Sequence, residues 1–93
     1  MSKVLIVDDD KSLVDVLGFA LANVGGFDVI KVSEGKEAVE VWRRELPDLV
    51  VLDANMPDSD GFEICRAART TYNLTTPVIM LTARTREEDM AQG

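Results

Sequence analysis

The stretch from Asp48 to Asp53 constrains the fold more than any other part of this sequence. It places four consecutive apolar residues, Leu49 to Leu52, between two aspartates. Such a run is too short and too uniformly apolar for an amphipathic helix, and it is typical of a strand buried on both faces of a parallel sheet. The turn-rich residues 54–61 that follow cannot continue a strand. Asp53 is therefore predicted to lie at the carboxyl end of a central strand, where open α/β sheets bind their ligands.

Three other segments have the composition of strands. Val4–Val7 and Val78–Leu81 are short, continuous apolar runs, and each is predicted to form a buried strand. Residues 27–32 make a half-polar run, which is typical of a strand at the edge of a sheet. Together with the central run, these segments predict a sheet of four strands.

Helices are predicted between the strands, because apolar residues there recur three and four positions apart. Glycine and proline mark the ends, since glycine readily takes the left-handed conformation that stops a helix and proline cannot continue one. The predicted helices run from residue 11 to Gly25-Gly26, from Ser33 or Glu34 to Glu45 before Pro47, and from Asp60-Gly61 to an end between residues 70 and 76. Their predicted inner residues are Leu13, Val14, Leu17, Ala20, Leu21 and Val24, then Ala38, Val41 and Trp42, then Phe62, Cys65 and Ala68.

Strand and helix alternate along the whole chain with short connections. This order predicts an α/β fold, a doubly wound parallel sheet with right-handed crossovers and helices on both faces. Thr85-Arg86-Glu87-Glu88 has the spacing of a capping box, so a fourth helix is predicted to begin near Arg86. A chain of 93 residues has room for one domain, which we expect to span residues 1–93.

Composition and charge exclude several classes of function. No apolar run approaches the roughly 20 residues of a membrane span, and the start Met1–Val4 does not have the shape of a signal peptide, so we expect a cytoplasmic protein without membrane contact. The net charge of −7 opposes direct contact with nucleic acid and fits a bound cation or a partner with a basic surface. The sequence has no histidine and a single cysteine, Cys65, which excludes a Cys/His zinc site.

Aspartates follow two of the predicted strands, with Asp8 and Asp9 after the first and Asp53 after the central one. If these strands are neighbours, three carboxylates converge in one crevice. Two unit charges about 4 Å apart repel by roughly 4 kcal/mol at an effective dielectric constant near 20, which equals about three pKa units. One carboxyl group would then be protonated at neutral pH unless a hard cation such as Mg²⁺ neutralises the group.

A structural interpretation of these residues also exists. Aspartates before a helix often cap its first turn, and this is the preferred interpretation of Asp10. For Asp8 and Asp9 taken alone, capping and cation binding are both open. Thr82 ends the last predicted strand, where its hydroxyl either caps the chain locally or donates to an anion in the same crevice. Acids and a hydroxyl at three strand ends favour a binding site.

Three segments of the sequence resemble the receiver domain of response regulators in two-component signalling. They are Leu5–Asp10, Leu52–Gly61 and Pro77–Ala83, in the order and spacing of that family. The run Asp-x-x-Met-Pro-x-x-Asp-Gly after an apolar strand is the most specific part, and the resemblance covers the whole chain. It implies a flavodoxin-like fold in which the strands are ordered 2-1-3-4-5.

The resemblance implies a role for each matching acidic residue. Asp53 matches the aspartate that accepts a phosphoryl group from a sensor histidine kinase or phosphotransfer protein. Asp8 and Asp9, together with Asp53, match the residues that hold Mg²⁺. Asn55 matches the position whose backbone carbonyl contacts that ion.

The remaining matches complete a phosphoacceptor site. Thr82 matches the hydroxyl that binds the phosphoryl group, and Ala83 matches a small residue that leaves the pocket open. The family implies a signalling module rather than an enzyme, with at most slow self-phosphorylation and self-dephosphorylation. Two alternatives stand beside it. One is a Mg²⁺-dependent phosphohydrolase with Asp53 as nucleophile, although Asn55 stands where its acid would be, and the other is an inactive structural fragment.

The sequence departs from the family pattern at its C-terminal end. Receiver domains have five strands and five helices, whereas this sequence supplies four strands and the start of a fourth helix. No lysine follows Thr82 to bridge the acceptor aspartate and the phosphoryl group, so we expect impaired phosphorylation. The strand Val78–Leu81 would then lie at the sheet edge without charge or proline to protect it. We expect a homodimer or larger assembly through this edge.

Overall fold

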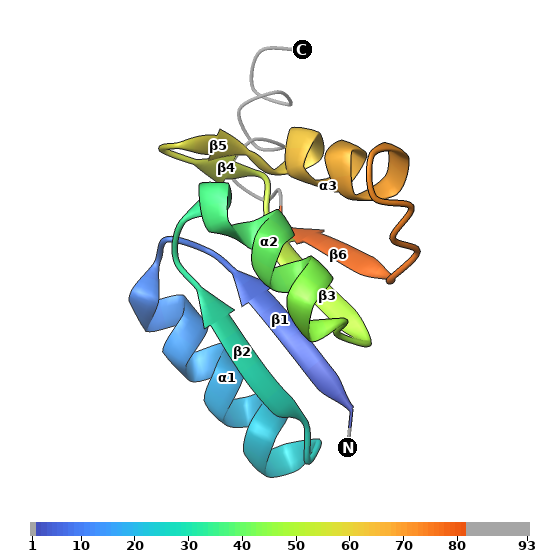
Figure 1. Cartoon of the computed structure of the whole chain (residues 1–93). Coiled ribbons are helices and arrows are strands. Elements are labelled where there is room, and N and C mark those ends of the chain that lie inside the picture. The colour runs from blue at the N-terminus through green and yellow to red at the C-terminus, as the bar shows by residue number, and fades with distance from the viewer. Residues whose placement is uncertain (1, 82–93) are drawn as a thin grey trace, which may run out of the picture.

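A four-stranded parallel sheet forms the centre of the structure, a computed structural model that describes residues 2–81 (Figure 1). The strands are β1 (Lys3–Val7), β2 (Asp28–Val32), β3 (Leu49–Asp53) and β6 (Val78–Leu81), in the order β2-β1-β3-β6. Every neighbouring pair is parallel. The apolar runs are therefore strands as predicted, the half-polar run is at an edge, and the predicted doubly wound α/β fold is confirmed.

Helices cover both faces of the sheet, which explains why β1 and β3 are apolar on both sides. α1 (Lys11–Val24) packs on one face, and α2 (Gly35–Glu45) and α3 (Gly61–Thr70) pack on the other. The buried residues on the α1 side are Val4, Ile6, Val14 and Val51. Those on the opposite side include Leu5, Val7, Ala38, Trp42, Val50, Leu52, Ile64 and Ala68.

The predicted inner side of α3 is partly wrong. Phe62 is 52% exposed, whereas Ile64 and Ala68 are buried. Gly61, Ile64 and Ala68 follow one another at helical spacing along the inner side, and Phe62 is turned about 100° away from Gly61. Cys65 is a free cysteine, half-buried and packed beside this core.

The prediction for α1 also needs correction. Val14 is buried, and Leu17 and Leu21 are partly buried against the core on this face of the sheet. Leu13, Ala20 and Val24 are instead exposed, Val24 by 90%. Apolar residues occupy most of the circumference of this helix, so their spacing alone fits more than one inner side.

Residues 54–61 form a short ribbon that the sequence pattern did not predict. β4 (Asn55–Met56) and β5 (Ser59–Asp60) pair antiparallel, with Pro57-Asp58 at the turn. Met56 is 7% exposed and packs into the core on the α2 side. Figure 1 shows the ribbon beside the first turn of α2. Along the chain, the ribbon thus connects the carboxyl end of β3 to the start of α3.

Both ends of α1 follow the capping residues of the sequence. Asp10 caps α1 by accepting a hydrogen bond from the Leu13 N–H, and α1 ends at Gly25, followed by Gly26 at φ +70°. No helix within residues 2–81 is long and apolar enough to cross a membrane. The predicted helix near Arg86 lies outside the described residues.

Candidate functional site

The carboxyl ends of β1 and β3 bring three aspartates together. Val7 of β1 is opposite Leu52 of β3 in the parallel register, so the next residues of the two strands, Asp8 and Asp53, face each other. Asp9 follows Asp8 on the same loop. β1 and β3 are therefore neighbours, which is the condition for the predicted convergence of the three carboxylates.

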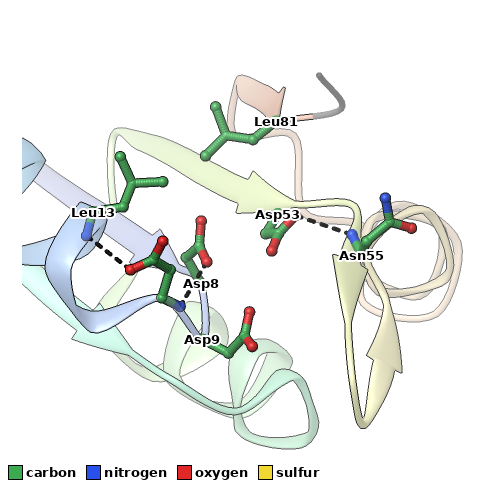
Figure 2. Close-up of a pocket in the computed structure, with 7 residues that line it drawn as sticks. Asp8, Asp9, Leu13, Asp53, Asn55 and Leu81 are labelled. Atoms are coloured by element: carbon green, nitrogen blue, oxygen red, sulfur yellow. Dashed lines mark hydrogen bonds between the residues drawn. The ribbon is translucent and has the colours of Figure 1, made fainter. Parts of the chain in front are cut away.

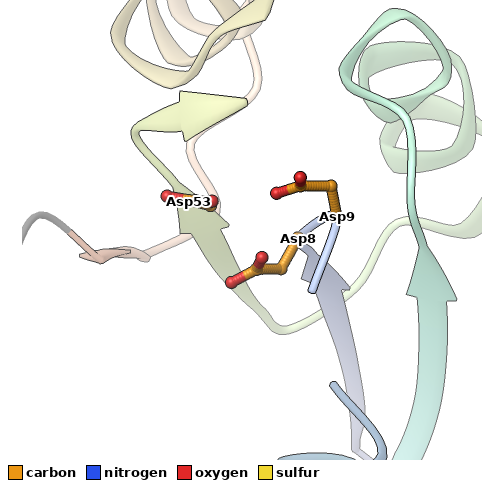
Figure 3. A group of neighbouring side chains, drawn as sticks. All are labelled: Asp8, Asp9 and Asp53. Atoms are coloured by element: carbon orange, nitrogen blue, oxygen red, sulfur yellow. The ribbon is translucent and has the colours of Figure 1, made fainter. Parts of the chain in front are cut away.

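The three carboxylates share one small space. Each of Asp8, Asp9 and Asp53 has an oxygen within 4.8 Å of an oxygen of the others, and Figure 3 shows the three groups turned toward one another. Asp8 is only 4% exposed and Asp53 only 5%, whereas Asp9 is exposed. Two charges are thus held close together and away from water, with the third at the opening.

Backbone N–H groups orient the two buried carboxylates (Figure 2). The Asp10 N–H donates to Oδ1 of Asp8 at 2.9 Å, and the Asn55 N–H donates to Oδ1 of Asp53 at 3.0 Å. The Asn55 side chain points away from the three carboxylates. Asp10 accepts from the Leu13 N–H at 3.2 Å, which confirms its interpretation as a helix cap.

The site opens into a hollow of about 580 Å³ at the end of the sheet. Its lining residues are Asp8, Asp9, Asp10, Leu13, Asp53, Asn55 and Leu81. Leu81 is the last described residue, so Thr82 and Ala83, the other predicted site residues, lie outside the described part of the chain. Four predicted site residues are therefore brought together, namely Asp8, Asp9, Asp53 and Asn55.

Burial makes the Asp8 carboxylate costly. Removal from water raises the pKa of Asp8 above its ordinary value of 3.8, and the charges of Asp53 and Asp9 raise it further. The hydrogen bond from the Asp10 N–H lowers the pKa of Asp8 and so opposes this effect in part. The three carboxylates therefore repel one another, and a bound cation would reduce this electrostatic repulsion.

The donor set fits a hard divalent cation. Mg²⁺ is bound through one or two carboxylates and keeps several water ligands, so it suits a cluster with one open side. Two buried carboxylates and the exposed Asp9 offer that arrangement. A soft metal such as zinc prefers thiolate and imidazole ligands, which this cluster does not contain.

Replacing Asp8 with asparagine is expected to stabilise the metal-free protein at neutral pH, because it removes a buried charge beside Asp53 and Asp9. The folded state raises the pKa of Asp8, so the folded protein holds this proton more tightly than the unfolded chain. The resulting contribution to stability is fully present below the unfolded pKa near 3.8 and is lost as the pH rises through the folded pKa. Urea unfolding with a chelator, from acid to neutral pH, measures this difference.

The comparison reports on Asp8 and its two neighbours in the cluster, because groups outside the cluster contribute equally in the two proteins. A hydrogen bond from Arg44 is the main cause that lowers the pKa of Glu45, and a hydrogen bond from the Lys36 N–H is the main cause for Asp58. The stability that these two carboxylates contribute is therefore lost on acidification in wild type and in D8N alike. Asp15→Asn, which breaks only an exposed ion pair with Lys31, is the control and should change stability little. A D8N protein less stable than wild type at neutral pH would contradict the prediction.

Sequence reasoning missed two residues that shape this site. Asp58 accepts hydrogen bonds from the first turn of α2, and Gly61 lies against the backbone of Asp53. In the run Asp-x-x-Met-Pro-x-x-Asp-Gly, Gly61 is the final glycine, whereas Asp58 stands at an unspecified position, so the run gave a signal for Gly61 alone. The spacing of residues in the sequence does not predict the contact of Asp58 with α2 or the close approach of Gly61 to the Asp53 backbone.

A family model for the response regulator receiver domain matches residues 4–93 of this chain. Solved structures of receiver domains have the same fold. The N-terminal domain of a response regulator receiver protein from Methanoculleus marisnigri is 37% identical with a TM-score of 0.81, covering 89% of this chain and 68% of that chain. The chemotaxis protein CheY4 of Vibrio cholerae is 31% identical with a TM-score of 0.79, covering 100% and 81%.

A third similar structure is the BeF3-activated N-terminal receiver domain of Klebsiella pneumoniae RstA. It is 33% identical with a TM-score of 0.77, and the match covers 85% of this chain and 65% of that chain. The match with the signal receiver domain of a Vibrio parahaemolyticus LuxO repressor protein covers 59% of that chain. The present chain is therefore shorter than the solved domains that it resembles.

Proposed function

Because this chain belongs to the response regulator receiver domain family, we propose that it is a phosphoacceptor module of cytoplasmic two-component signalling. Asp53 is the proposed acceptor, and a sensor histidine kinase or phosphotransfer protein is the proposed donor. The observation that carries this proposal is the convergence of Asp8, Asp9 and Asp53, with Asp53 buried at the end of a central strand. We propose one such domain over residues 1–93.

The proposed cofactor is Mg²⁺, held by the carboxylates of Asp8, Asp9 and Asp53 and by the backbone carbonyl of Asn55. When bound, the ion would offset negative charge on the acceptor and on the incoming phosphoryl group. The outward-pointing side chain of Asn55 fits this role, since only its backbone would be needed at the site.

The residues of the chain supply orientation for the transfer. A carboxylate oxygen of Asp53 forms a bond to phosphorus while the bond between phosphorus and the donor nitrogen breaks. The electron pair of the broken bond stays on the donor nitrogen. The Asn55 N–H holds the Asp53 carboxylate in place through Oδ1. Thr82 is the proposed hydroxyl donor to the phosphoryl oxygens, and Ala83 the proposed small residue beside the pocket. These roles rest on the family match.

The proposed role is a signalling module, with no turnover beyond slow self-dephosphorylation. A phosphohydrolase would need a general acid beside the nucleophile. Asn55 is not an acid, and its side chain points away from the three carboxylates. This arrangement favours a phosphorylated protein that persists over one that is rapidly hydrolysed.

Incubation with acetyl phosphate and Mg²⁺ tests the proposal. A persistent mass increase that maps to Asp53 by peptide analysis is the expected result. Rapid release of inorganic phosphate without an accumulated adduct would instead support the phosphohydrolase. No reaction, under conditions where a full-length receiver domain is modified, would leave a structural fragment and contradict the proposal.

We also propose that the chain self-associates through β6. Within residues 2–81, β6 pairs with β3 on one side only, and it carries no charge or proline to block pairing on the other. Ile79 of β6 is 51% exposed, and Leu13 of α1 is 43% exposed. Burial of such side chains stabilises an assembly by about 25 cal/mol for each Å² of apolar surface removed from water.

Replacing Ile79 with lysine is expected to convert the proposed dimer to a monomer at micromolar concentration. A lysine on this strand adds a charge that opposes edge pairing and removes exposed apolar area. Light scattering behind a sizing column measures the mass, and Val24→Lys, at an exposed apolar position in the last turn of α1, is the control. A wild-type chain that elutes as a well-folded monomer would refute self-association.

A further inference from the structure

The first turn of α2 is capped by a residue that is distant in the sequence. Glu34 occupies the N-cap position, but its side chain makes no capping hydrogen bond. Asp58 takes this role instead, because Oδ1 accepts from the Gly35 N–H at 3.1 Å and Oδ2 accepts from the Lys36 N–H at 3.2 Å. One carboxylate thus satisfies two N–H groups that every helix start leaves without an intrahelical partner.

Close packing accompanies these hydrogen bonds. Gly35 is buried, and a Cβ atom at this position would overlap the side chain of Ser59 and approach Cε of Met56 to 3.1 Å. The ribbon β4–β5 therefore lies directly on the start of α2. Asp58 holds the turn of the ribbon there, while Met56 anchors its other strand in the core.

The same ribbon reaches the candidate site on its other side. Asn55, the first residue of β4, donates its N–H to the Asp53 carboxylate at 3.0 Å and lines the hollow. Only Met56 and Pro57 lie between the clamp at Asp58 and this contact at Asn55. A ribbon released from α2 would lose one of the contacts that hold Asn55 beside Asp53.

We infer that Asp58 is a positioning residue, which fixes the ribbon β4–β5 on the first turn of α2 and thereby holds Asn55 beside Asp53. This inference rests on the proposed function, in which the Asn55 backbone contacts Mg²⁺. The hydrogen bond from the Lys36 N–H lowers the pKa of Asp58, so the clamp is ionised at neutral pH. α2 is thus linked to the site through one side chain.

The test compares Asp58→Ala with wild type in two measurements. Without metal, amide hydrogen exchange of Gly35, Lys36 and Asn55 should accelerate by about tenfold, because the ribbon opens locally while the sheet stays intact. With metal, calorimetric titration should show Mg²⁺ affinity reduced by about threefold to tenfold, at or below the ~10–100-fold loss typical of groups that contact a ligand directly. Asp15→Ala, which removes an equal charge from an exposed position, should change neither quantity.

A second substitution separates positioning from helix capping. Glu34→Asp, added to Asp58→Ala, supplies a short local acceptor at the N-cap and should restore the stability of α2. It cannot tie the ribbon down, so Asn55 exchange and Mg²⁺ affinity should remain those of the single variant. Restoration of both by Glu34→Asp would show that Asp58 is only a cap and would overturn the inference.

The outcomes distinguish this inference from the proposed function. Wild-type affinity for Mg²⁺ in the D58A variant, together with unchanged Asn55 exchange, would refute the positioning role while leaving the function in place. Failure of the wild-type chain to bind Mg²⁺ would refute the proposed cation site. The exchange of the Asn55 amide in the metal-free protein would then still decide whether Asp58 holds the ribbon.

Discussion

Replacement of Asp53 by asparagine is expected to abolish phosphorylation of the chain by acetyl phosphate in the presence of Mg²⁺. The amide oxygen is a poor nucleophile compared with a carboxylate, while the similar shape preserves acceptance of the Asn55 N–H at the same position. Loss of one of three clustered charges should also weaken Mg²⁺ binding by about tenfold, which corresponds to roughly 1.4 kcal/mol. Mass spectrometry follows the adduct, and calorimetric titration follows the ion.

The controls assign the effect to the cluster. Asp9→Ala should weaken Mg²⁺ binding and slow phosphorylation, since Asp9 belongs to the cluster but is not the acceptor. Asp10→Asn should leave both properties near wild type, because Asp10 lines the same hollow but faces the helix start. A D53N protein that gains a phosphoryl group at the wild-type rate would show that the acceptor is another residue. Mg²⁺ binding unchanged by Asp9→Ala would remove Asp9 from the site.

The sequence allowed the sheet and its acidic end to be predicted because both depend on short-range patterns. Continuous apolar runs identified β1 and β3, and each run ended in aspartate. Once these strands are neighbours, the parallel register leaves Asp8 and Asp53 opposite each other. The site followed from composition at strand ends and from adjacency, without any need for side-chain detail.

The parts that could not be predicted depend on contacts between distant residues. Asp58 reads as an ordinary turn residue, and nothing within its own segment shows that α2 begins 23 residues earlier in the chain beside it. The inner side of α3 was misassigned because Phe62 is the largest apolar residue near its start, whereas Ile64 fits the spacing from Gly61. Tertiary packing decides both cases.

Replacement of Gly61 by alanine is expected to destabilise the protein by about 2 to 3 kcal/mol and to disturb Asp53 itself. Gly61 begins α3 and donates its N–H to the Ala54 carbonyl at 3.0 Å. A Cβ atom here would overlap the Asp53 carbonyl oxygen and approach Cα of Ala54 to 2.7 Å. These are backbone atoms, and the Ala54 N–H is itself bonded to the Leu81 carbonyl at 3.1 Å, so neither side can yield without disturbing the sheet.

Two other glycines separate this steric effect from the general properties of glycine. Gly18→Ala in α1 brings a Cβ atom to 2.9 Å from Cε of Lys31, the far end of a flexible side chain that can move, and alanine is the better helix former by about 0.8 to 1 kcal/mol. Gly26→Ala meets open space but keeps a left-handed φ of +70°, which costs about 1 to 2 kcal/mol.

We therefore expect the urea midpoint to fall most for G61A, less for G26A, and to stay or rise for G18A. Only G61A should also slow phosphorylation at Asp53, because only this Cβ atom presses on the strand end that carries the acceptor. A G61A protein as stable as wild type, with an unchanged phosphorylation rate, would mean that α3 can move away from β3 without cost. The close approach of helix and strand would then have no part in holding the acceptor in place.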